Sequence, residues 1–162
     1  MGANHHSQES LRSHLIGTSS ILARWQCSDA ICSAGLCNSI YGTESFLKVS
    51  AALDNREYMK KLIGFEAENL AYLFGAHKKE SLWKNLKIST DFSIHNRFTD
   101  RRYVISRNEL ASLITITLAN WLEQRPRARI KDQYVRLTEF KSSEEFLPPV
   151  AYQEFLCTYN LN

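Results

Sequence analysis

The residues of this chain best placed to do chemistry are a few polar side chains on helix faces that should otherwise be apolar. His14 and Thr18 share one predicted helical face with Leu11, Leu15, Leu22 and Trp25. On a second predicted helix, starting near residue 29, Asn38 falls in line with Ile31, Ala34 and Tyr41. A buried polar group without a partner costs about 1–3 kcal/mol, so we expect these side chains to bond to one another or to a ligand. Imidazole exchanges protons near neutral pH, which makes His14 the candidate acid or base.

Gly42 ends the second predicted helix and begins the candidate rim of a pocket. Tyr41 and Thr43 flank this glycine, so we expect both to lie near Asn38 and to contact a substrate. An equally good interpretation is that Gly42 adopts the left-handed conformation and Thr43 only terminates the helix. The two interpretations are compatible.

A further polar residue of this kind lies late in the chain. Ser106 and Glu109 form a capping box, which is the clearest helix start in the sequence, and the helix should run to about residue 124. Asn120 falls on the apolar face of this helix, so it can face the core beside His14. The alternative is that Asn120 is a core amide bonded to a neighbouring backbone carbonyl.

The remaining elements are helical except for one insertion. Two helices separated by Gly64 are predicted between residues 54 and 74, and a short one around Trp83. Between residues 88 and 105 apolar and polar residues alternate, which predicts an irregular β-hairpin or a long loop. If this insertion covers the pocket, Arg97 is the candidate contact to an anionic ligand. The alternative is an exposed Arg–Asp pair worth well under about 1 kcal/mol.

Composition places the chain among ordinary soluble globular proteins of one domain. It has 162 residues, of which 44% are hydrophobic and 23% charged, and a net charge of +3. This charge is too small to predict nucleic acid as a partner, and the basic residues between 125 and 131 belong to no recognisable nucleic-acid-binding module. No apolar run reaches the length of about 18 residues that a membrane span needs. The N-terminus is polar, so we expect a cytoplasmic protein with neither a membrane segment nor a secretory signal.

The motif LCNSIYGT at residues 36–43, some two dozen residues after His14, carries a resemblance to a known family. It resembles a branch of small helical proteins related to the HD superfamily of metal-dependent phosphohydrolases, whose second motif reads leucine, any residue, His-Ser, an aliphatic residue and Tyr-Gly-Thr. The likeness extends to His6-Ser7, Gly17-Thr18 and the runs IGFEAENLAYLF and NWLEQ. It implies an all-α, HD-domain-like bundle of about five to seven helices with one short β-hairpin or loop insertion near 90–105. The chain 1–162 would form a single domain, with its core at about 6–126 and a C-terminal extension at 127–162.

The same resemblance bears on metal binding. In an active HD protein the metal site consists of one His, a His-Asp pair and a later Asp, and the corresponding positions here hold His14, Asn38-Ser39 and Asn120. Divalent cations require several charged oxygen or imidazole ligands, which this set lacks, so we expect no tightly bound metal and no other cofactor. A pocket that has lost its negative charge instead favours a neutral polar or anionic ligand.

These observations favour one functional hypothesis and leave others open. The favoured hypothesis is a metal-free pocket for a small polar or anionic metabolite, with His14 as acid or base and with Asn38 and Ser39 orienting the substrate. Asn120 or Arg97 would stabilise negative charge. The alternatives are a non-catalytic ligand-binding or regulatory HD-like protein, a structural interaction domain, and a metal-dependent phosphohydrolase with atypical ligands.

The two ends of the chain also leave alternatives open. His6 precedes the first predicted helix, whose cap is Ser7 or Ser10. It is either exposed in a polar terminus or, as the resemblance favours, brought near His14 and the substrate by an arm that folds over the pocket. The extension 127–162 covers either the bundle or a second subunit, and in the second case the chain would form a homodimer.

Overall fold

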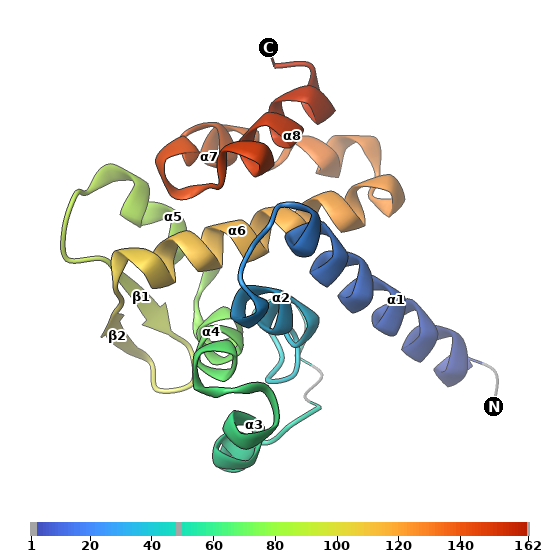
Figure 1. The fold of residues 1–162 in the computed structure, drawn as a ribbon, viewed down its shortest axis with the longest axis vertical. Coiled ribbons are helices and arrows are strands. Elements are labelled where there is room, and N and C mark those ends of the chain that lie inside the picture. Colours follow the sequence, from blue (N-terminus) through green and yellow to red (C-terminus); the bar gives the residue numbers. More distant parts are fainter. Residues whose placement is uncertain (1–2, 48–49, 162) are drawn as a thin grey trace.

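The structure is a computed structural model that describes residues 3–47 and 50–161, with only the backbone described for residues 3–10, 130 and 131. The described part contains eight α-helices and one two-stranded antiparallel sheet (Figure 1). These elements are α1 (Ala3–Arg24), α2 (Asp29–Leu36), α3 (Arg56–Ile63), α4 (Phe65–Ala76), α5 (Lys79–Lys84), β1 (Ser93–Asn96), β2 (Arg101–Val104), α6 (Arg107–Gln124), α7 (Leu137–Lys141) and α8 (Pro149–Tyr159). The prediction of a mainly helical fold with one small hairpin is confirmed. None of the helices described here is long and apolar enough to cross a membrane.

Helix α6 runs through the middle of the molecule and contacts α1, α2 and α4 (Figure 1). Its start is fixed by the predicted capping box, in which Ser106 Oγ accepts a hydrogen bond from the Glu109 N–H at 3.1 Å and the Glu109 carboxylate accepts one from the Ser106 N–H at 2.7 Å. Its fully buried side chains are Leu110, Leu113, Ile114, Ile116, Leu118 and Ala119. The buried middle part of α6 therefore forms the surface on which α1 and α2 pack.

Helices α1 and α2 pack closely on each other as well as on α6. Gly35 of α2 lies against the fully buried Leu22 of α1, and a Cβ at this position would overlap the Leu22 side chain. Trp25 near the end of α1 is also buried and belongs to the same core. The absence of a side chain at Gly35 therefore sets how near the two helices can come.

Two boundaries differ from those predicted. Helix α1 begins at Ala3 rather than at Ser7 or Ser10, so the expected folded arm is a straight continuation of the helix. Helix α2 ends at Leu36, and residues 37–41 form turns closed by i→i+3 hydrogen bonds, such as the one from the Asn38 N–H to Gly35 O at 3.4 Å. Gly42 then adopts a φ of +69°, which is the left-handed conformation considered for it.

The C-terminal extension packs on the bundle. Helices α7 and α8 lie along one side of α6 (Figure 1), and Phe140 and Phe155 are fully buried in the common core. Trp121 of α6 donates a hydrogen bond from Nε1 to the hydroxyl of Tyr159 at 2.8 Å, which ties α8 to the central helix. The extension thus completes the core of this chain.

Candidate functional site

His14 lies where α1 meets α6, with a hydrogen-bonding group at each of its ring nitrogens. Its Nδ1 is hydrogen-bonded to the Glu123 carboxylate, and its Nε2 lies 2.9 Å from Asn120 Oδ1. Asn38 donates from Nδ2 to the same Asn120 oxygen at 3.3 Å. Only 13% of the His14 side chain and 11% of the Glu123 side chain are exposed. Three segments far apart in the sequence therefore bring polar side chains to one nearly buried point.

The surroundings of His14 can accommodate two protonation states of the ring. A carboxylate only accepts hydrogen bonds, so the contact with Glu123 places a proton on Nδ1. When Nε2 also carries a proton, Asn120 Oδ1 at 2.9 Å accepts it. When Nε2 is unprotonated, the amide nitrogen of Gln124 at 3.3 Å is the available donor. A group that must take up and release a proton needs a partner in each state, and His14 has both.

Glu123 reaches His14 because α1 carries no side chain at Gly17. A Cβ at Gly17 would lie 2.8 Å from Glu123 Cγ, so this glycine gives the carboxylate room between the two helices. Burial by itself raises the pKa of Glu123, but hydrogen bonds from Arg127 and His14 outweigh it, and the pKa is lowered. The carboxylate therefore stays ionised beside His14 at neutral pH.

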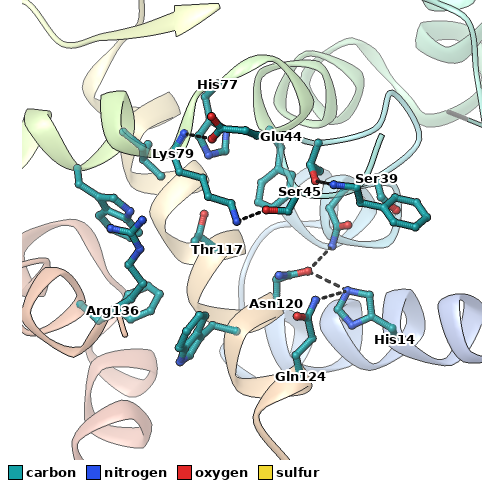
Figure 2. A pocket seen from close by; sticks show the side chains of 18 of the residues that line it. His14, Ser39, Glu44, Ser45, His77, Lys79, Thr117, Asn120, Gln124 and Arg136 are labelled. Atoms are coloured by element: carbon teal, nitrogen blue, oxygen red, sulfur yellow. Dashed lines mark hydrogen bonds between the residues drawn. The ribbon is translucent and has the colours of Figure 1, made fainter. Parts of the chain in front are cut away.

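A pocket of about 380 Å³ opens next to this cluster (Figure 2). Polar groups line it at two places, with His14, Asn120 and Gln124 at one and Glu44, His77 and Lys79 at the other (Figure 2). The lining also includes Asn38 and the aromatic side chains of Phe46, Phe74, Trp83, Trp121 and Phe140. Binding sites for small organic molecules occupy about 300–1,000 Å³ and are largely apolar with a few convergent polar groups. Both the size and the lining of this pocket fit that description.

Five of the residues singled out from the sequence line the pocket, namely His14, Asn38, Ser39, Thr43 and Asn120. Thr43 belongs to the loop after Gly42, where its Oγ1 accepts a hydrogen bond from the Phe46 N–H at 3.1 Å and shapes the rim. Ser39 is 8% exposed and lies in the turn that follows α2.

Thr18 and Tyr41, expected to contact substrate, lie outside the pocket lining. Thr18 is fully buried and donates a hydrogen bond from its hydroxyl to the backbone carbonyl of His14 at 3.0 Å. The Tyr41 hydroxyl donates to Glu68 at 2.8 Å, and Glu68 also binds the Arg56 guanidinium. Each hydroxyl donates its proton inside the protein, and the expected substrate contacts of Thr18 and Tyr41 stay predictions.

Arg97 also lies outside the pocket lining, and its expected contact with an anionic ligand stays a prediction. Its guanidinium donates to Gly75 O at 2.7 Å and to Tyr41 O at 3.2 Å, and it stacks on the Phe98 ring at 4.3 Å. The carbonyls near the end of a helix have no intrahelical partner, and Arg97 supplies one at the end of α4. The hairpin is therefore fastened to α4 by this side chain.

His6 lies in α1, eight residues before His14, which corresponds to about 12 Å along the helix axis. The helical backbone replaces the folded arm that would have brought it over the pocket. Its side chain lies outside the described residues, so its expected contact with substrate stays a prediction.

Several pocket residues were missed in the sequence. Gln124 follows Asn120 by one helical turn, a spacing that could have revealed it, whereas His77 and Lys79 carry no such signal. Glu123, the missed partner of His14, lies outside the pocket lining. His77 is buried, its Nδ1 donates to Leu73 O at 3.2 Å, and burial lowers its pKa to about 4. It is therefore a neutral imidazole at physiological pH.

The donor set does not fit a tightly held divalent cation. Within the described part of the chain, no three His, Cys, Asp or Glu side chains cluster in a way that could hold a metal ion. At the positions that would carry HD-type ligands, His14 is engaged by Glu123, and Asn38, Ser39 and Asn120 are neutral. We therefore derive no chemistry through a metal at this site.

Comparison with known proteins gives one match. Residues 1–79 match the model of a domain of unknown function, DUF6817. No curated protein and no solved structure matches the chain significantly. The matched stretch supplies His14, Asn38 and His77, whereas Asn120 and Glu123 come from the part of the chain beyond it.

Proposed function

We propose that the pocket binds a small polar or anionic metabolite and that His14 is the acid or base that acts on it. The observation that carries this proposal is the placement of His14, with Nδ1 held by the Glu123 carboxylate and Nε2 at the pocket between Asn120 and Gln124. A carboxylate that orients an imidazole also stabilises its protonated form, which is the arrangement general acid–base catalysis requires.

The other polar groups have defined parts in this proposal. Asn38 and Ser39 lie beside His14 and can orient a ligand by hydrogen bonds from neutral groups. Asn120 keeps its oxygen on His14 and Asn38, so its amide nitrogen is left as a donor for charge that develops on the ligand. Proton-transfer reactions such as hydrolysis, elimination or isomerisation are all compatible with one histidine supported in this way.

The finer expectations from the sequence remain proposals. An HD-like relationship is supported by the convergence of His14, Asn38 and Asn120, because these are the positions that the resemblance assigns to the metal site. We also propose a cytoplasmic location, which microscopy of the tagged protein would test. A homodimer through residues 127–162 would appear as a doubled mass in light scattering after size-exclusion chromatography.

The experiment that tests the proposed function begins with a thermal-shift screen of carboxylates, sugar phosphates and nucleotides. Compounds that raise the melting temperature are then incubated with the protein, and product is followed by NMR. We expect His14→Asn to abolish turnover, because it removes the imidazole, and Glu123→Gln to lower it by about 10²-fold or more, because it removes the carboxylate that supports the ring. His95→Ala, which changes an exposed histidine outside the pocket, is the matched control.

Three results would decide between the hypotheses. Turnover that persists in His14→Asn contradicts the acid–base part of the proposal. Binding without product in the wild type favours a ligand-binding or regulatory protein with the same pocket. A wild-type protein that binds none of the compounds favours a structural domain in which the polar side chains only satisfy one another.

A further inference from the structure

His77 presents to the pocket a ring nitrogen that receives no hydrogen bond from the described residues. Its side chain lines the pocket and its residue is 6% exposed. The proton on Nδ1 is used by Leu73 O at 3.2 Å, so the lone pair of the ring is on Nε2. No donor among the described residues bonds to that nitrogen, so it is available to a ligand in the pocket.

Two contacts orient the His77 ring. The Phe74 ring meets it edge to face with 5.5 Å between ring centroids, and the Nδ1 hydrogen bond returns to the preceding turn of α4. The charged groups near the ring are Glu44 and Lys79, which act on its protonation in opposite directions. Neither compensates for burial, so the imidazole stays neutral and its Nε2 stays an acceptor.

Lys79 provides the complementary charge. Two cationic side chains line the pocket in the described part of the chain, and Arg136 is paired with Glu80 and Glu139. Lys79 Nζ contacts only the Ser45 hydroxyl and forms no ion pair with a described residue. The Glu44 carboxylate accepts a hydrogen bond from the backbone N–H of Lys79 at 2.8 Å, which partly offsets the negative charge of Glu44. The Lys79 ammonium is therefore the group available to an anion.

We propose that His77 determines the specificity of the pocket by accepting a hydrogen bond on Nε2 from a hydroxyl or N–H of the ligand, while Lys79 binds the ligand's anionic group. This inference rests on the proposed function and narrows its ligand class. The ligand is an organic anion with one neutral hydrogen-bond donor and an apolar body that contacts aromatic side chains of the lining such as Phe74, Trp83 and Phe140. Figure 2 shows His77 and Lys79 on the side of the pocket away from His14, so the ligand would extend between the two histidines.

The test uses pairs of acids that differ by one hydroxyl. The probes are 3-phenyllactate against 3-phenylpropionate and indole-3-lactate against indole-3-propionate, with affinities measured by calorimetry. For the wild type we expect the hydroxy acid of a pair to bind about tenfold more tightly, because only it satisfies Nε2. In His77→Phe the two members should bind equally, and in Lys79→Met both should weaken by the same factor. His95→Phe, at an exposed site outside the pocket, is the control and should retain the wild-type preference.

A second measurement avoids any dependence on the folding of a variant. In wild-type protein labelled with ¹⁵N at histidine, the His77 Nε2 resonance should have the shift of an unprotonated nitrogen and should move when the hydroxy acid, but not its deoxy partner, is added. Equal affinity for both members in the wild type, or an unchanged Nε2 resonance on hydroxy-acid binding, overturns the inference.

The failure of this inference differs from the failure of the proposed function. If compounds of the general screen bind but none of the four acids does, the assigned ligand class is wrong and the pocket keeps its proposed function. If nothing binds in either screen, both proposals are wrong.

Discussion

The burial of His77 predicts a specific loss of stability in mild acid. In the folded protein its pKa is lowered to about 4 from an ordinary value of 6.5, because burial disfavours the charged ring. In the unfolded chain the ring is in water and takes up a proton as the pH falls below its ordinary value. The unfolded state therefore binds more protons between these two pKa values, and the free energy of unfolding decreases as the pH falls through this range. Above the ordinary pKa of 6.5, the ring is neutral in both states, and the full stabilisation of the folded protein relative to acid pH is present.

The magnitude follows from the two pKa values. One unit of difference corresponds to about 1.4 kcal/mol, so relative to neutral pH His77 removes about 2 kcal/mol at about pH 5 and about 3 kcal/mol at about pH 4. The perturbation that isolates this contribution is His77→Gln, which removes the titrating ring but keeps an amide that can donate to Leu73 O. The variant should be less stable than the wild type at neutral pH, and the gap should close by these amounts as the pH is lowered.

The assay is urea unfolding, followed by tryptophan fluorescence, at a series of pH values between about 4 and about 7.5. The carboxylates, including Glu44 close to the ring, are present in both proteins. Their effect on the pH dependence therefore largely cancels when the unfolding free energies of the wild type and the variant are subtracted. Parallel pH profiles for the two proteins would refute the reasoning, because they would mean that His77 titrates at the same pH in the folded and unfolded states. A gap that widens toward low pH would give the opposite sign and refute it too.

Three further predictions concern stability and can be measured by the same urea unfolding at neutral pH. Glu68→Gln should destabilise the fold by about 2–3 kcal/mol, because the buried carboxylate binds the half-buried Arg56 guanidinium through two hydrogen bonds and its loss leaves that charge unpaired; an unchanged midpoint would contradict this. Gly35→Ala should cost about 1–3 kcal/mol, since the new Cβ overlaps Leu22, and a wild-type value would mean that the helices can move apart freely. Ser106→Ala removes the N-cap of α6 and should cost about 1 kcal/mol, with Ser106→Asp expected to restore most of it.

Local signals in the sequence were sufficient for the main features of the fold. The capping box at Ser106 and Glu109 placed α6 correctly, and the alternation between residues 88 and 105 indicated the hairpin that forms at 93–96 and 101–104. The same periodicity placed His14 and Asn120 on inward faces, and they meet there. These signals are local in the chain, so they are available without knowledge of the packing.

The features that were missed depend on packing between distant segments. Glu123 would ordinarily be assigned to solvent, and only the close approach of α1 at Gly17 makes it a partner of His14. Arg97 could not be placed from the sequence, because its partners are carbonyls at the end of a helix two dozen residues away. No hydrophobic periodicity in the sequence marks His77 as buried. Its backbone forms a bridge with Asn96 of the hairpin, a contact between distant segments that covers it.

The pocket is built from two parts of the chain, and only one of them lies in the stretch with a family match. His14, Asn38, His77 and Lys79 all fall within the stretch that matches the domain of unknown function, whereas Asn120 and the other side chains of α6 do not. In this chain, the matched stretch carries His14, while the carboxylate and the amide oxygen that bond to its ring come from α6. A similarity confined to residues 1–79 therefore does not cover the residues that hold the His14 ring, and any transfer of function should be judged at the positions of α6.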